Sequence, residues 1–318
     1  MDAPLVATRA VHLAATLLLT GGLAFQCFVT PPLSRTKAGA ALEARLRVWL
    51  ARMNWTALAA ALVSGAAWLV LLAAEIGEVP AAQALSEGWS WQLLTQTTFG
   101  TVWTLRLAMI ALLVVVLLLP RAWQRTFHLD AISAALAAAV AAGIAWTGHA
   151  AGMDGLDGAI HLTSDALHLV AAGVWLGALG PLAVLLAAAS RAGDPGSAAV
   201  AYQATQRFSV LGMISVAAIL ATGVVNTWEI LGSAAFSLGT DYNRLLFAKI
   251  GLFFAMVAIA AFNRRFLTPQ LSRAADRGRA MRQLRWNSLT EIALALMILA
   301  IVAVLGRMTP HTDMGMGM

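Results

Sequence analysis

The sequence predicts an all-α integral membrane protein, a bundle of eight transmembrane helices, on three observations. Hydrophobic residues make up 60% of the 318 residues and charged residues only 11%, whereas soluble domains carry about 25% charged residues. The apolar residues gather in eight segments of about 20 residues, the length that crosses a bilayer. Lys and Arg are concentrated in alternate loops, so the net charge of +6 indicates membrane topology and not nucleic-acid binding.

The eight expected spans follow one another along the whole chain. They cover residues 7–29, 52–74, 99–119, 129–148, 161–186, 208–230, 244–262 and 288–306. We expect the first to be a retained helix and not a signal peptide, because residues 1–8 lack Lys and Arg and no A-x-A site follows. Pro31-Pro32 ends this span, and the basic stretch up to Arg47 is expected to lie as a helix on the inner membrane face.

The basic residues also predict the orientation. The loops after the first, third, fifth and seventh spans contain 16 of the 21 Lys and Arg residues, and the other loops contain acidic residues such as Glu75 and Glu87. We therefore expect the odd-numbered loops in the cytoplasm and both termini outside it. Glu291, near the inner end of the last span, is expected to pair with an arginine of residues 282–285.

The loops and the single cysteine add further expectations. Residues 76–98 form the longest outer loop, and tryptophans around it (Trp89, Trp91 and Trp103) are expected in an interfacial aromatic belt. Gly-Asp-Pro-Gly at 193–196 predicts a turn, which closes an N-terminal half of residues 1–192. Cys27 excludes an intramolecular disulfide and is expected to pack as a small hydrophobe.

Ionisable and polar side chains gather in the outer third of the expected bundle. Asp165 and His168 lie one helical turn apart in the fifth span, and His161 lies two turns before His168 on the same stripe. An ionisable group at membrane depth is costly and normally has a partner or a function. At similar depth the sequence places His12, Arg106, His149, Asn226 and Lys249.

We interpret Asp165 and His168 as a metal site, because a carboxylate that orients an imidazole is the usual environment of a metal-binding histidine. Other interpretations remain open for the residues around them. His12 is equally well explained as an interhelical hydrogen-bonding group. Arg106 and Lys249 are expected to extend to the outer lipid headgroups rather than to touch a ligand.

Residues 307–318 form a tail that is rich in Met and His. Thioether and imidazole groups suit Cu(I), a soft ion, although a disordered tail that is methionine-rich by chance is the alternative. The candidate metal ligands are therefore His12, His149, Met153, His161, Asp165, His168, His311, Met314, Met316 and Met318, with Arg106, Asn226 and Lys249 as supporting polar residues.

Several segments resemble the copper resistance protein D (CopD) family of bacterial inner-membrane proteins. They are SDALHLVAAGVWLGAL (164–179), ATGVVNTW (221–228), DYNRLLFAKIGLFF (241–254), AFNRRFLTPQL (261–271), NSLTEIALAL (287–296) and, less closely, FGTVWTLRLA (99–108) and TGHAAG (147–152). The resemblance is strongest over residues 161–306, the fifth to eighth spans. It implies an eight-helix protein that handles copper and carries it inward, often together with a small periplasmic copper-binding partner (CopC-like). The family's recurrent polar positions match His149, Asp165, His168, Asn226 and Lys249.

The first functional hypothesis is that the protein takes copper from the periplasm into or across the membrane, without being an enzyme. Below His168 the fifth span offers only Ala, Gly, Val, Trp and Leu, so the inner half of an ion path is unaccounted for. The alternative is a redox protein that binds haem b, because HLVAAGVWLGAL also resembles a segment of the haem-containing protoporphyrinogen oxidase family. Haem ligation would pair His168 with His149 or His12. A third hypothesis is a structural membrane subunit.

Overall fold

The computed structural model describes residues 3–30, 37–119, 127–147, 155–231 and 239–308, and every regular element in these ranges is a helix. Eight of the helical stretches are long and apolar enough to cross a membrane, which confirms the predicted fold class. They are α1 with η1 (Ala3–Ala24 and Phe25–Val29), α2 (Lys37–Ile76), α5 (Thr98–Leu118), α7 with η2 (Phe127–Ala142 and Gly143–Thr147), α8 (Gly155–Ala192), α9 (Pro195–Leu231), α10 with η5 and α11 (Asp241–Phe262, Asn263–Leu267 and Thr268–Gln270) and α12 (Arg277–Leu305).

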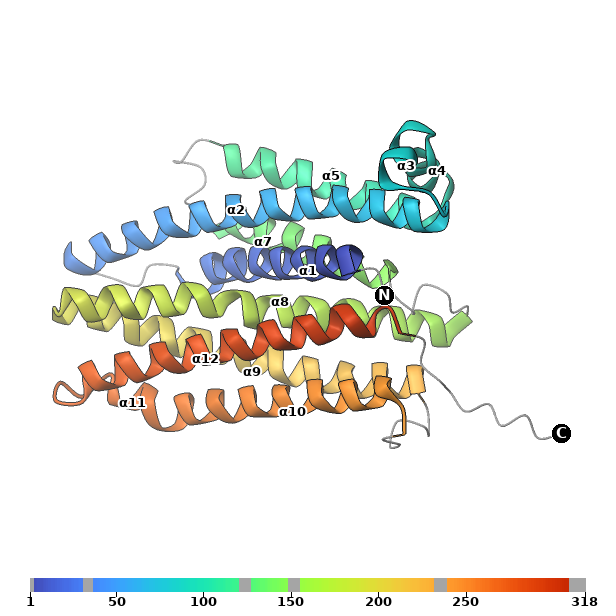
Figure 1. Ribbon diagram of the computed structural model, residues 1–318. Helices are drawn as coiled ribbons and strands as arrows, with labels where there is room; N and C mark the ends of the chain where they lie inside the picture. The colour runs from blue at the N-terminus through green and yellow to red at the C-terminus, as the bar shows by residue number, and fades with distance from the viewer. Residues whose placement is uncertain (1–2, 31–36, 120–126, 148–154, 232–238, 309–318) are drawn as a thin grey trace.

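The helices lie side by side around α8, which packs against α1, α9 and α12 (Figure 1). On one side of this centre lie α2 and α5, and on the other lies α10 (Figure 1). One end of the bundle holds the start of α1, the end of α12 and the short helices α3 (Ala81–Ser86) and α4 (Trp89–Gln96), and we call it the outer end. The inner end is the opposite one, with α11 and the junction of α8 and α9 (Figure 1). Which end faces the periplasm stays a prediction.

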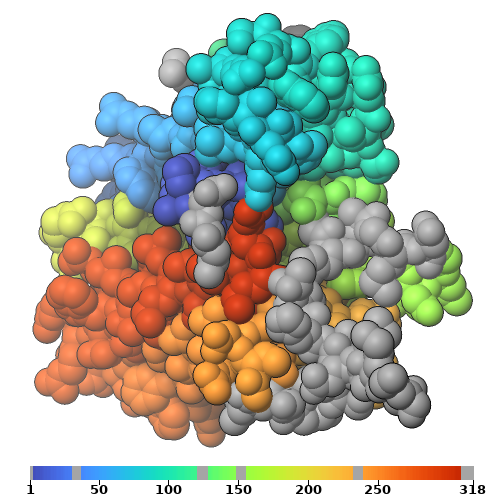
Figure 2. Space-filling view, turned by 45° about the vertical axis from the view of Figure 1, so that its right-hand side comes forward, coloured from blue at the N-terminus to red at the C-terminus, as the bar shows by residue number. Residues whose placement is uncertain are grey.

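Polar contacts tie α1, α2 and α12 together at the outer end. Arg9 donates a hydrogen bond from Nη1 to the carbonyl oxygen of Gly306 at 2.8 Å, and Arg307 forms an ion pair with Glu75. Figure 2 shows the end of α12 (red) meeting the end of α2 and α3 (cyan) beside α1 (blue). The first and last spans therefore begin and end on the same side of the bundle, as an even number of crossings requires.

The basic stretch before residue 52 continues the second span and is not a separate helix on the membrane face. Helix α2 runs without a break for 40 residues. Leu42, Leu46 and Leu50 recur at a spacing of four and are buried in the main core, because successive turns of one helix present them to α8 and α9. The expectation of a surface-lying segment was wrong, since this buried leucine stripe gives the stretch a partner inside the bundle.

The turn predicted at 193–196 is confirmed, since α8 ends at Ala192 and α9 begins at Pro195. Asp194 caps α9: its Oδ1 accepts a hydrogen bond from the Ser197 backbone N–H at 2.9 Å, and its Oδ2 accepts one from the Ser197 hydroxyl at 2.6 Å. These hydrogen bonds hold the pKa of the Asp194 carboxyl below its usual value. The division of the chain into residues 1–192 and 161–306 stays a prediction.

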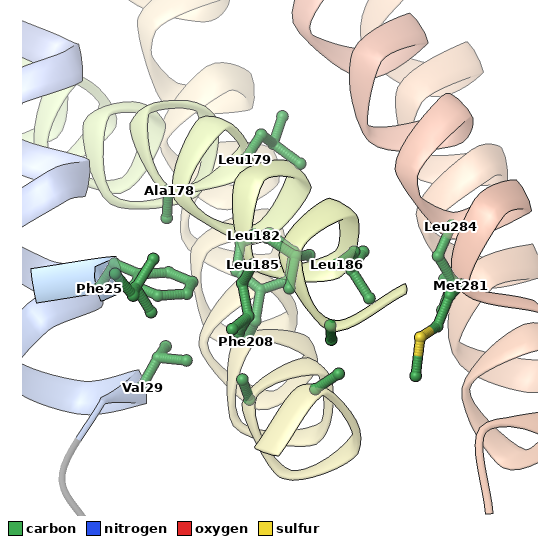
Figure 3. Packing of buried hydrophobic residues seen from close by; sticks show 14 of the residues in the cluster. Phe25, Val29, Ala178, Leu179, Leu182, Leu185, Leu186, Phe208, Met281 and Leu284 are labelled. Carbon is green, nitrogen blue, oxygen red and sulfur yellow. The ribbon is translucent and has the colours of Figure 1, made fainter. Parts of the chain in front are cut away.

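The largest hydrophobic cluster surrounds the inner half of α8. It joins Phe25 and Val29 of η1, Ala178, Leu179, Leu182, Leu185 and Leu186 of α8, Phe208 of α9, and Met281 and Leu284 of α12 (Figure 3). Helices in lipid associate through close packing, which small residues at the interface permit. Gly21 of α1 and Gly177 of α8 permit such close packing between these two helices, because a Cβ on Gly177 would lie 2.9 Å from the Gly21 Cα. Cys27 is fully buried in a second cluster, as expected.

Candidate functional site

Five of the residues singled out from the sequence meet in one cavity of about 180 Å³ near the outer end, which we call the outer cavity. Its walls come from α1, α2, η2, α8, α9, α10 and α12. The five are His161, Asp165 and His168 of α8, Asn226 of α9 and Lys249 of α10. The sequence spacing had placed the three α8 residues on one face, and their common cavity confirms this.

His168 is oriented by Thr222 and not by Asp165. Its Nδ1 lies 2.9 Å from Thr222 Oγ1. The Thr222 hydroxyl donates its own hydrogen to the Ala218 carbonyl oxygen at 2.6 Å, so it accepts from His168, and we assign the ring proton to Nδ1. Nε2 is then an unprotonated nitrogen with no hydrogen-bond partner in the described ranges. This is the tautomer in which a histidine binds a metal ion through Nε2.

Asp165 has a different partner from the one expected. Its Oδ1 accepts a hydrogen bond from Asn226 Nδ2 at 3.4 Å, and it attracts Lys249 across the cavity. No direct ion pair joins Asp165 to Lys249 in the part of the chain that the structure describes. Lys249 lines the cavity and therefore does not simply extend to the headgroups.

The outer cavity also contains a buried acceptor that the described chain leaves unused. Asn226 Oδ1 is buried and has no hydrogen-bond partner among the described residues. Most buried polar atoms in folded proteins are hydrogen-bonded, so an exception calls for an explanation such as a bound ion or water. Asn226 Oδ1 and His168 Nε2 are thus two polar atoms of residues that line one cavity and have no hydrogen-bond partner among the described residues. The arrangement can bind a small polar ligand or a metal ion.

His12 and Arg106 form a separate polar pair. His12 Nδ1 lies 3.0 Å from the Ala61 carbonyl oxygen, and its Nε2 lies 2.9 Å from Arg106 Nη2. Both ring nitrogens are therefore occupied by protein groups. Neither residue lines the outer cavity, so His12 is not grouped there with His161, Asp165 and His168, either as a metal ligand or as a haem partner. The interpretation of His12 as an interhelical hydrogen-bonding group fits this geometry.

The sequence had suggested that Arg106 extends to the lipid headgroups, but in the structure it does not. It is 3% exposed, donates from Nε to the Val140 carbonyl oxygen at 3.0 Å, and stacks over the Trp103 ring at 4.7 Å. Trp103 is itself buried, against Trp68, so its expected place in an interfacial belt was also wrong. Partners on other helices turn both side chains inward, and local sequence cannot show this.

The remaining candidates, His149, Met153, His311, Met314, Met316 and Met318, lie outside the described residues. Within the described ranges, no three His, Cys, Asp or Glu side chains are grouped closely enough to hold a metal ion. Thr147, the last residue of η2, lines the outer cavity, so the chain leaves the described range at this cavity, two positions before His149.

The inner half of the bundle contains a polar cluster that was not predicted from the sequence. Glu291 Oε1 accepts a hydrogen bond from Asn263 Nδ2 at 3.0 Å, and Asn263 Oδ1 accepts one from Asn287 Nδ2 at 2.5 Å. The expected pairing of Glu291 with an arginine of 282–285 was therefore wrong. The spacing of four between Asn287 and Glu291, which puts both on one helix face, was the available signal. Thr222 was overlooked in the same way, four positions before Asn226.

Two further cavities continue from the outer cavity toward the inner end. The central cavity, of about 340 Å³, shares His168 and Lys249 with the outer cavity. The inner cavity, of about 370 Å³, shares Trp175 and Leu220 with the central one and reaches Glu291. The three cavities thus follow each other between α8, α9, α10 and α12.

Comparison with known proteins identifies the family. The family model described as "Copper resistance protein D" matches residues 202–305, and the one described as "Copper resistance protein D-like, N-terminal domain" matches residues 1–159. No solved structure matches the chain significantly.

Three curated proteins illustrate the similarity. The chain is 31% identical over 268 residues to copper resistance protein D of Pseudomonas syringae pv. tomato, covering 80% of this chain and 85% of that protein. It is 29% identical over 316 residues to inner membrane protein YebZ of Escherichia coli K12, covering 96% and 98%. It is 32% identical over 119 residues to copper transport protein CutJ of Bacillus subtilis, covering 37% and 21%. The chain is thus a multi-pass inner-membrane protein and belongs to the copper resistance protein D family.

Proposed function

We propose that this protein binds copper from the periplasm in the outer cavity and passes it into or across the inner membrane. The observation that carries the proposal is His168, whose Nε2 has no hydrogen-bond partner among the described residues while Thr222 fixes the ring. The two relatives named for copper resistance and copper transport support copper as the cargo. On this proposal the bundle moves an ion and performs no covalent chemistry.

The charges of the cavity suit a monovalent ion such as Cu(I) better than a divalent ion. The imidazole groups of His168 and His161 line the cavity, and the carboxylate of Asp165 is offset by Lys249. A site with little net negative charge favours a monovalent ion, and imidazole is a ligand that binds copper. We propose that His149 completes this site, because it follows the cavity-lining Thr147 by two residues. Met153, His311, Met314, Met316 and Met318 would then collect copper outside the cavity.

The inner half of the path, which the sequence left open, would run through the central and inner cavities. Met256 lines the central cavity and Met213 the inner one, so each offers a thioether to a soft ion. Trp175 stands between the two cavities and is 1% exposed, so it would control passage. A small periplasmic copper-binding protein (CopC-like) would deliver the ion at the outer end.

Metal analysis of the purified full-length protein tests the proposal. We expect about one copper ion per wild-type chain and much less in His168→Ala, whereas His128→Ala, which changes a histidine of α7, should retain it. Full copper content with unchanged affinity in His168→Ala would contradict the site. A visible spectrum of the same samples tests the haem alternative. A Soret band that is present in the wild type and disappears in His168→Ala would show that His168 binds haem b and not copper.

A further inference from the structure

The inner cavity contains a buried carboxyl group that the proposed copper site does not use. Glu291 on α12 is 2% exposed. One of its oxygens, Oε1, accepts the hydrogen bond from Asn263, whereas Oε2 is buried and has no hydrogen-bond partner among the described residues. Glu291 lines a cavity of about 370 Å³, so there is space at its side chain.

The surroundings of Glu291 provide almost no compensating charge. The charged residue that shares its cavity is Arg264 of η5, which is exposed and donates its Nη1 hydrogen bond to Ser209 of α9 at 2.8 Å. Arg282 and Arg285, on Glu291's own helix, are exposed. The other polar residues of the cavity wall are neutral, and they are Thr205 and Ser209 of α9, Asn263 of η5, Thr268 of α11 and Ser288 of α12. Helix α8 contributes the apolar residues Trp175 and Leu182.

An ionised carboxylate in such a place is unfavourable. Burying an unpaired charge costs more free energy than one hydrogen bond from a neutral amide returns. Binding a proton removes the charge and turns Oε2 into a hydrogen-bond donor that faces the cavity. A metal ion would need more ligands, and within the described ranges no group of three His, Cys, Asp or Glu surrounds Glu291. The chemistry therefore favours a proton over a metal ion.

We propose that Glu291 is a proton-exchange site in the inner half of the bundle. In the resting protein the carboxyl group is protonated, and on deprotonation its proton passes to water that enters the inner cavity from the end where Arg264 is exposed. Asn263 holds Oε1 in place in both states, since an amide N–H can donate to a carboxyl and to a carboxylate oxygen. This site goes beyond copper binding and does not depend on it.

Modification by dicyclohexylcarbodiimide, in liposomes that contain the full-length protein, tests this proposal. This apolar reagent reacts with protonated carboxyl groups: the acid proton moves to a carbodiimide nitrogen, and the carboxyl oxygen bonds to the central carbon. Rearrangement leaves a stable N-acylurea that mass spectrometry locates. We expect an adduct on Glu291 near neutral pH, with a yield that falls as the pH rises, and no adduct at this position in Glu291→Gln.

Glu75 is the matched control, because it is ion-paired with Arg307 and should stay unmodified over the same pH range. The Asn263 side chain stabilises the Glu291 carboxylate by donating to Oε1. Because Asn263→Leu removes this donor, the carboxyl group should stay protonated, and modification should persist, to higher pH than in the wild type. Asn287→Leu changes a residue that donates its hydrogen bond to Asn263 and not to Glu291, so it should shift the profile less.

An infrared measurement covers the case in which the reagent fails to reach the cavity. A protonated carboxyl group gives its own carbonyl stretching band, and this band should be present in the wild type and missing in Glu291→Gln. If neither the adduct nor the band depends on Glu291 at neutral pH, the residue is ionised and the proposal is wrong. Glu75 modified as readily as Glu291 would contradict it equally.

Discussion

Thr222 of α9 accepts a hydrogen bond from Nδ1 of His168 of α8, at a distance of 2.9 Å. The same hydroxyl donates to the Ala218 carbonyl oxygen, so its hydrogen is not available to the imidazole. Ser164, one turn before His168, donates to the Thr222 carbonyl oxygen at 3.1 Å and ties the two helices at this point. These contacts fix both the orientation and the tautomer of the His168 ring, whose Nε2 has no hydrogen-bond partner in the part of the chain that the structure describes.

Replacing Thr222 tests whether this orientation matters for copper binding. Thr222→Val keeps the shape of the side chain and removes the acceptor, so we expect Cu(I) affinity to fall about 10- to 100-fold, the usual effect of losing a group that orients a metal ligand. Thr222→Ser keeps the hydroxyl and should bind within a few-fold of the wild type. Competition with a chromophoric Cu(I) chelator measures both. Equal affinities for the Val and Ser variants would show that Thr222 has only a packing role.

The charges of Asp165 and Lys249 are expected to act on copper in opposite directions. Asp165→Asn keeps the contact with Asn226 but leaves the positive charge of Lys249 uncompensated, so Cu(I) affinity should fall roughly tenfold, which is about 1.4 kcal/mol. Lys249→Met leaves Asp165 uncompensated and should raise the affinity by a similar factor. The double variant should return close to the wild type, because each change removes the other's imbalance. Affinity that moves in the same direction in both single variants would contradict the electrostatic account.

The eight spans could be predicted because length and apolar composition are local properties of the sequence. The stripe of His161, Asp165 and His168 could be predicted for the same reason, since one helix fixes its own periodicity. The hydrogen-bond partners of these residues on other helices could not be predicted from the sequence. Thr222 is 54 positions from His168 and His12 is 94 positions from Arg106, and which side chains meet depends on the rotation of each helix about its axis.

The close approach of α1 and α8 gives a prediction about stability. A Cβ at Gly177 would collide with the Leu17 carbonyl oxygen and the Gly21 backbone, so Gly177→Ala must push two spans apart. We expect a loss of about 1–3 kcal/mol, typical of overpacking, and a lower melting temperature in detergent. Gly251→Ala is the matched control, because nothing lies within 4 Å of a Cβ at that position. Equal melting temperatures for the two variants would show that the interface relaxes at no cost.

Trp175 offers a way to separate copper binding from copper passage. It lines both the central and the inner cavity, and its ring meets Phe253 edge-on at 6.1 Å. Trp175→Phe shortens the barrier and keeps an aromatic ring against Phe253, so the fold should survive. We expect copper content at the outer cavity to stay unchanged and copper uptake into proteoliposomes to become several-fold faster, because the two cavities then join.

The control for Trp175 is a second tryptophan of the central cavity. Trp228 also lines this cavity but is 61% exposed and does not reach the inner one, so Trp228→Phe should leave the uptake rate unchanged. Uptake that is measured with a chelator sealed inside the liposomes reports passage alone, and metal analysis of the same protein reports binding alone. If Trp175→Phe binds copper normally and takes it up at the wild-type rate, the ion does not pass between these two cavities, and a path through α8, α9 and α10 is wrong even though the outer site stands.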